Sequence, residues 1–198
     1  MLKKTFLILF SVFAGINVHA QSADSVYNQY LDFNLARLQS DNDKMLELGE
    51  NILPNAEKLP EKARINFYFA VGQLYENNNE PKKALTYYEK VAVAVPDYYV
   101  VHRALGYLYL ANATETGKKL NGENTDIAEN KRLAQLYEQQ VRKALPHLEK
   151  AQACDPSDET LAIIKRLYKN IKDTAGLNSL DSRLKQLNKN CIDILSSQ

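Results

Sequence analysis

Apolar residues recur at steps of three and four along most of the chain, the spacing that places them on one face of an α-helix. The first two rows are Tyr27, Leu31, Leu35 and Leu38, followed by Met45, Leu48, Ile52 and Leu53. The same period continues through 63–76 and 81–95. No segment of five or more residues alternates apolar and polar positions with β-branched enrichment, as a half-buried strand does. The pattern therefore predicts an all-α protein.

The first twenty residues have the features of a secretory signal peptide. Lys3 and Lys4 give a positive start, an apolar stretch covers 6–18, and Val18-His19-Ala20 carries the small residues of a cleavage site. An uncleaved membrane anchor is the alternative, but 13 residues span about 20 Å of helix, short of a membrane core of roughly 30 Å. We expect cleavage after Ala20 and an exported protein, periplasmic or secreted, with no membrane span in residues 21–198.

Composition excludes several classes of protein. The 198 residues are 45% hydrophobic and 25% charged, which is typical of a globular domain and not of a disordered or collagen-like chain. The net charge is +1, and it becomes −1 once Lys3 and Lys4 leave with the signal peptide. Proteins dedicated to nucleic-acid binding are usually strongly basic, so we expect no nucleic-acid partner.

An internal repeat is visible around two glycines. Gly72 and Gly106 stand one 34-residue period apart inside helical patterns, where glycine costs about 1 kcal/mol relative to alanine. Both are preceded by an apolar residue and followed by the same spacing of Leu and Tyr, in 71–75 and 105–109. A glycine at such a place needs a packing reason, and we expect two helices to approach closely there.

These residues resemble the tetratricopeptide repeat (TPR), a 34-residue pair of helices with small, aromatic and proline residues at set places. The most complete repeat is 65–98, which also carries Tyr68, Ala84, Leu85, Tyr88, Ala92 and Pro96. The resemblance implies a TPR-like, right-handed α-solenoid of about three to four helical pairs. Residues 22–60 are then a degenerate first pair and 157–198 are capping helices, whose outer faces should be polar.

The repeat at 99–156 is interrupted. Its first helix should run from Tyr99 to about Ala111, but the alanine expected at position 118 stands at Ala144. We expect the inserted residues to form a protruding helical hairpin at about 112–143. It is either a tolerated surface insertion or an element that docks a partner or covers a ligand.

Within the insertion, the residues from Gly117 to Thr125 are rich in loop formers, and Asp126 is a plausible N-cap for the helix that follows. Pro146 should kink or break that helix near Arg142, because proline removes one backbone hydrogen bond and clashes with the preceding turn.

Residues suited to chemistry are sparse in the mature chain. His102 and His147 lie on different predicted helices, and no His, Cys, Asp or Glu cluster has metal-ligand spacing. No nucleophile, zinc or phosphate-loop motif occurs either. We expect no enzymatic activity, no metal and no cofactor. Cys154 and Cys191 meet if the last two helices run antiparallel, and they are either a disulfide or two buried thiols.

The TPR resemblance also implies a binding groove, because in TPR proteins the outward positions of the first helices line a concave surface. Carried over to this sequence, these positions are Asn66, Phe69, Gln73, Glu76, Asn77, Val100, Arg103, Tyr107 and Leu110. Aromatic and Arg side chains are common anchors of protein contacts. The TPR proteins that bind chaperone tails have Lys and Asn where Phe69, Gln73 and Tyr107 stand, so that ligand class is not expected.

The expected function is therefore that of a non-enzymatic scaffold in the cell envelope, which holds an extended peptide or helix of a protein partner in this groove. Two alternatives remain open. A soluble binding protein for a small ligand or glycan would use the tyrosines, with the inserted hairpin as a lid. Otherwise Phe69 and Tyr107 pack against a capping helix that fills the groove.

Overall fold

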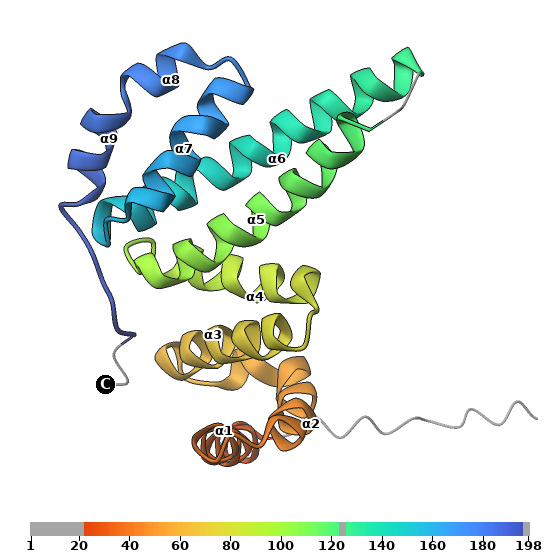
Figure 1. The fold of residues 1–198 in the computed structure, drawn as a ribbon. Helices are drawn as coiled ribbons and strands as arrows, with labels where there is room; N and C mark the ends of the chain where they lie inside the picture. The colour runs from red at the N-terminus through yellow and green to blue at the C-terminus, as the bar shows by residue number, and fades with distance from the viewer. Residues whose placement is uncertain (1–21, 123–125, 196–198) are drawn as a thin grey trace, which may run out of the picture.

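The computed structural model describes residues 22–122 and 126–195, and these are almost entirely helical (Figure 1). In chain order the helices are α1 (Ala23–Leu38), α2 (Asn42–Ile52), the 3₁₀ helix η1 (Leu53–Lys58), α3 (Glu61–Asn77), α4 (Pro81–Ala94), α5 (Tyr99–Leu120), α6 (Ile127–Cys154), α7 (Asp158–Asn170), α8 (Thr174–Asn178) and α9 (Leu180–Leu187). These ranges contain no β-strand and one isolated bridge, between Tyr98 and Ile192. The all-α prediction is confirmed. The expected signal peptide, residues 1–20, lies outside the described residues.

Helices that follow one another in the chain pack together. The pairs α1–α2, α3–α4 and α5–α6 are each in contact, α4 packs on α5, and both α7 and α9 pack on α6. The helices succeed one another from α1 at one end to α7, α8 and α9 at the other (Figure 1). One continuous apolar core runs between them, from Val26 in α1 to Leu180 in α9.

Three of the helices end in the same way. Ser40, Asn79 and Lys172 follow α1, α3 and α7 with φ of 57°, 59° and 56°, the left-handed conformation that closes many helices. After each, a backbone N–H reaches back to a carbonyl in the last turn of the helix, as from Glu80 to Tyr75 at 2.8 Å. This cap turns the chain sharply into the next helix.

Both repeat glycines lie where two helices cross. A Cβ on Gly72 would be 2.6 Å from the ring of Tyr88 in α4, and one on Gly106 would be 2.8 Å from the side chain of Leu148 in α6. Tyr88 and Leu148 are buried, with 1% and 0% of their surface exposed. The predicted packing reason for both glycines is confirmed. Once the inserted residues are subtracted, Leu148 follows Gly106 at the same distance in sequence as Tyr88 follows Gly72.

The insertion lengthens two helices instead of adding a new pair. α5 continues to Leu120 and α6 begins at Ile127, so the two project beyond the other helices as an arm (Figure 1). Asp126 caps α6 as predicted, accepting from the Ala128 N–H at 2.9 Å. The predicted end of α5 near Ala111 and the loop role of Gly117 are wrong. A Cβ on Gly117 would be 3.3 Å from Tyr137, so this glycine lets the helices of the arm pack closely.

Of the kink or break predicted near Arg142, the break is wrong, because α6 is one helix through Pro146. The proline lies on the exposed side of α6, while its neighbours Leu145 and Leu148 are buried in the core. Packing against α5 on the buried side therefore holds the helix together where one backbone hydrogen bond is missing.

The first helix is apolar on two faces. Its buried side chains are Val26, Tyr30, Phe33 and Ala36. The row Tyr27, Leu31, Leu35 and Leu38 is 40%, 49%, 53% and 81% exposed. The apolar period at the start of the chain thus predicts the helix correctly, but the residues of this period lie on its exposed face. The outer face of α1 is therefore apolar, whereas a polar outer face is expected of a helix at the end of the array.

Candidate functional site

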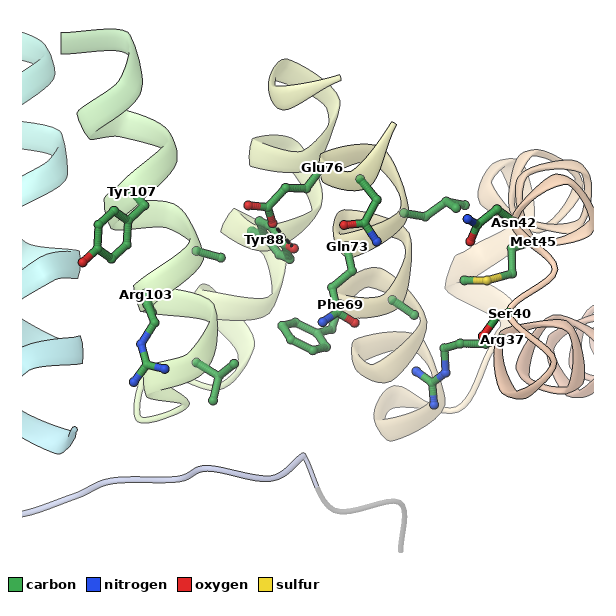
Figure 2. Close-up of a pocket in the computed structure, with 15 residues that line it drawn as sticks. Arg37, Ser40, Asn42, Met45, Phe69, Gln73, Glu76, Tyr88, Arg103 and Tyr107 are labelled. Atoms are coloured by element: carbon green, nitrogen blue, oxygen red, sulfur yellow. Dashed lines mark hydrogen bonds between the residues drawn. The ribbon is translucent and has the colours of Figure 1, made fainter. Parts of the chain in front are cut away.

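An open groove of about 660 Å³ lies between the α1–α2 turn, α3 and α5 (Figure 2). Of the nine residues proposed from the TPR resemblance, seven line it: Phe69, Gln73, Glu76, Asn77, Val100, Arg103 and Tyr107. Figure 2 shows Phe69 and Gln73 between Arg103 on one side and Arg37 on the other. Side chains from α3 and α5 therefore face the same space.

The other two residues lie elsewhere. Asn66 lines a smaller hollow of about 270 Å³ together with Ile192 and Ile194 of the C-terminal segment. Leu110 lines a separate cleft beside the arm. Both sit about one helical turn beyond the groove, Asn66 before Phe69 and Leu110 after Tyr107.

Sequence reasoning missed the wall formed by the first helical pair. Arg37, Ser40, Asn42 and Met45 complete the groove from the α1–α2 turn. This pair lacks the repeat glycine on its first helix, so no motif fixed which of its residues face the groove. The left-handed backbone at Ser40 turns the chain here and brings these side chains opposite α3.

The aromatic side chains of the groove are partly engaged in packing. The Phe69 ring meets Tyr98 edge to face with centroids 5.2 Å apart, and it lies 5.8 Å from the ring of Tyr88. Tyr107 is 37% exposed, and its hydroxyl bonds to that of Thr160 in α7 at 2.9 Å. The side chains of Phe69 and Tyr107 therefore make contacts within the protein, and no helix of the described chain fills the groove.

Two of the three charged side chains in the described lining of the groove, Arg103 and Glu76, have partners within the protein. Arg103 forms an ion pair with Asp155 and lies over the ring of Tyr99. Glu76 accepts a hydrogen bond of 2.7 Å from the Tyr88 hydroxyl, and burial raises the pKa of that phenol, so it stays a donor. Arg37, Gln73 and Asn77 are exposed and offer hydrogen-bond donors to a ligand.

The two histidines, His102 on α5 and His147 on α6, contact each other. His102 Nε2 donates to the Pro96 carbonyl at 3.0 Å, so its Nδ1 accepts from His147 Nδ1–H, 2.8 Å away. Burial lowers the pKa of both rings, that of His147 to about 4. The pair fits the packing role expected for His102. In residues 22–122 and 126–195 no group of three or more His, Cys, Asp or Glu is placed to hold a metal ion.

A disulfide joins Cys154 at the end of α6 to Cys191, with Cα atoms 5.6 Å apart. The next residue, Ile192, donates its N–H to Asp97 O at 2.8 Å and accepts from the Tyr99 N–H at 3.1 Å. The C-terminal segment is therefore fixed to the turn between α4 and α5, close to the residues that carry the groove.

The buried ammonium of Lys150 reinforces this attachment. It donates to the Asp97 carboxylate at 2.8 Å and to the Leu187 carbonyl at 3.2 Å, and only 6% of its side chain is exposed. A buried charge is costly unless paired in this way, so the contact ties α6, α9 and the α4–α5 turn together.

No helix in the described part of the chain is long and apolar enough to cross a membrane. Comparisons with models of protein families, with curated proteins and with solved structures give no match to this chain.

Proposed function

We propose that this protein is an exported, non-enzymatic scaffold that binds a segment of a partner protein in the cell envelope through the groove of α3 and α5. One observation carries the proposal. Seven residues selected from the sequence by repeat position line a single open groove, although they lie on two helices of different repeats. Surface residues chosen at random would be scattered over the molecule instead of lining one groove.

The proposal includes a TPR-like solenoid. Its support is the shared register of the glycine contacts, since Gly72 with Tyr88 and Gly106 with Leu148 occupy the same crossing point once the insertion is subtracted. The common cap after α1, α3 and α7 adds a second repeated feature. Stacked helical pairs of this kind give extended concave binding surfaces.

The chemistry of the groove favours an extended or helical peptide. Phe69 and Val100 offer apolar contact, while Gln73 and Asn77 can bond to main-chain carbonyls and amides. Arg103 and Glu76 are held by Asp155 and Tyr88, an arrangement that suits a preformed binding surface. Among the described residues of the lining, no nucleophile is paired with a base.

Export is supported by the signal-like residues 1–20 and by the disulfide between Cys154 and Cys191. Disulfides of this kind persist in the periplasm and outside the cell, whereas cytosolic proteins are usually kept reduced.

Site-specific photo-crosslinking in the native cells tests the proposal. A benzophenone side chain replaces Gln73, which is exposed in the groove, or Val93, which is 82% exposed on α4 and does not line it. We expect a protein adduct at position 73 and none at position 93. Equal adducts at both positions, or none at 73, contradict the proposal. A saturable rise in thermal stability with a sugar or other small molecule favours the ligand-binding alternative.

A further inference from the structure

A second cleft of about 950 Å³ lies between the arm and α7, and we call it the arm cleft. One wall is formed by the far halves of α5 and α6, and the other by the last turns of α7. It shares no lining residue with the groove of α3 and α5. More than half of its lining residues, among them Lys118, Tyr137 and Glu138, belong to the insertion, so the arm creates the cleft.

Three cations surround the arm cleft: Lys118 on α5, Arg166 on α7 and Lys172 just after α7. All three are exposed, and among the described residues none has a carboxylate within ion-pair distance. They come from two segments, α5 and the end of α7, so no single helix face explains their gathering.

The acidic side chains nearby are already paired with other cations. Glu138 lines the cleft but is bound by Arg142 at 2.9 Å, and Asp173 is bound by the same Arg142 at 3.3 Å. Glu115 on the arm holds Lys119 at 2.6 Å. Arg142 offsets only one of the two carboxylates that it binds, so Lys118, Arg166 and Lys172 leave an excess of positive charge at the cleft, in a protein of near-zero net charge.

The lining of the cleft also includes apolar side chains. Leu110, Leu120, Leu167 and Ile171 contribute to it. Tyr137 is the one aromatic residue among the described residues of the lining, and its hydroxyl accepts from Asn170 Nδ2 at 2.9 Å. The cleft thus offers both apolar contact and positive charge.

We propose that the arm cleft binds an acidic peptide segment of a protein, whose carboxylates pair with Lys118, Arg166 and Lys172 and whose apolar side chains contact Leu110 and Ile171. Charge complementarity of this kind sets partner choice and speeds association. A membrane surface does not fit a concave cleft. An acidic glycan would pair with the cations but would leave the apolar side chains of the lining without a partner, whereas an acidic peptide with apolar residues uses both.

Selection from a displayed library of random peptides of roughly 12 residues tests this proposal on the whole protein. We expect the wild-type protein to enrich peptides rich in Asp and Glu beside apolar residues. The triple variant Lys118→Glu, Arg166→Glu and Lys172→Glu should lose them, by about tenfold or more in affinity. For the wild type, raising salt from about 50 to 500 mM should also weaken binding about tenfold.

The control reverses the same number of charges outside the cleft, on α6 and α7, two of the three helices that flank it, with Lys131→Glu, Lys165→Glu and Lys169→Glu. This variant has the same net charge as the triple variant and should keep the wild-type affinity. If the charge-reversed variant does not fold, a neutral variant, Lys118→Gln, Arg166→Gln and Lys172→Asn, replaces it in the test. Asn is used at position 172 because it tolerates the left-handed backbone there.

Selected peptides that are not acidic overturn the proposal. So do acidic peptides that bind the charge-reversed cleft variant and the control variant with equal affinity. So does a selection without any enriched acidic peptide, and so does an acidic polysaccharide probe that binds where no peptide does. None of these outcomes bears on the groove of α3 and α5, because the two sites have no lining residue in common.

Discussion

At the scale of single residues, the helical glycines of this fold are explained by the side chains that face them. Gly72 faces the buried ring of Tyr88, which follows it in the chain, whereas Gly49 on α2 faces Phe33 on α1, which precedes it by the same separation. The first helical pair thus has the large residue on its first helix and the small one on its second, the reverse of the next pair. Sequence reasoning found Gly72 by its repeat period and missed Gly49, because the exchange of sizes removes the motif.

Gly72→Ala should destabilise the protein by about 1–3 kcal/mol, because the new methyl group would lie 2.6 Å from the Tyr88 ring. This ring is buried and its hydroxyl is held by Glu76, so it has no room to move. The gain in helix propensity, about 1 kcal/mol, does not offset such a clash. Urea unfolding followed by circular dichroism measures the change.

Gly49→Ala is the matched control. Its methyl group would lie 3.6 Å from Phe33 and 3.9 Å from Val71, which is ordinary contact. The variant should be more stable than the wild type by up to about 1 kcal/mol, through helix propensity alone. If both variants shift stability in the same direction, the explanation of Gly72 by close helix packing is wrong.

The histidine pair should make stability depend on pH. Burial lowers the pKa of His147 from 6.5 to about 4 in the folded protein, so the unfolded chain binds more protons between these values. The contribution to stability is fully present above about pH 6.5 and is lost as the pH falls toward 4. In addition, Lys150 near His102 disfavours a second positive charge there.

Relative to His147→Gln, the wild type should therefore lose about 1–2 kcal/mol of stability between about pH 7 and pH 4.5, an amount reduced by the partial exposure of the ring. Urea unfolding at a series of pH values measures the difference. A difference that stays constant with pH contradicts the burial of a neutral histidine pair.

At the scale of elements, the sequence predicts helices reliably and their ends less well. The period of three and four finds every long helix, because each buries an apolar face. The extension of α5 past Ala111 and the continuity of α6 through Pro146 depend on packing between α5 and α6, which no local signal carries. For the same reason the period in α1 does not say which of its two apolar faces is buried.

The C-terminal segment depends on one covalent attachment. Cys191→Ser, or reduction of the disulfide, should lower the free energy of unfolding by about 2–4 kcal/mol, since it opens a link between residues 37 apart in sequence. Hydrogen exchange should show lost protection first at the amides of Ile192 and Tyr99, which bond across the segment and the α4–α5 turn. Unchanged protection at these two amides contradicts the role given to the disulfide.

At the scale of the whole molecule, the repeat register predicts most of the groove. Two glycines one repeat apart fix the rotation of α3 and α5, and this places Phe69, Gln73 and Tyr107 correctly on one surface. The wall from α1 and α2 could not be predicted, because the first pair lacks the motif. The arm cleft could not be predicted either, since it depends on how far two helices extend past α7.

Excising the arm tests the interpretation of 99–156 as one interrupted repeat. Residues 111–140 are replaced by Asn-Asn-Asn-Glu, the turn that joins α3 to α4 at 77–80. Because this restores the repeat spacing and keeps the core residues Val141 and Leu148, the variant should unfold cooperatively, within about 2 kcal/mol of the wild type. Calorimetry measures this, and a variant that does not fold contradicts the interpretation.

The proposed binding of a partner segment in the groove of α3 and α5 is tested most directly by affinity. The segment identified by crosslinking is titrated calorimetrically against the wild-type protein, Gln73→Arg and Val93→Arg. We predict that Gln73→Arg weakens binding about tenfold or more, a loss of at least about 1.4 kcal/mol, while Val93→Arg changes it by less than about twofold. Equal affinity for all three proteins would contradict the binding role of the groove.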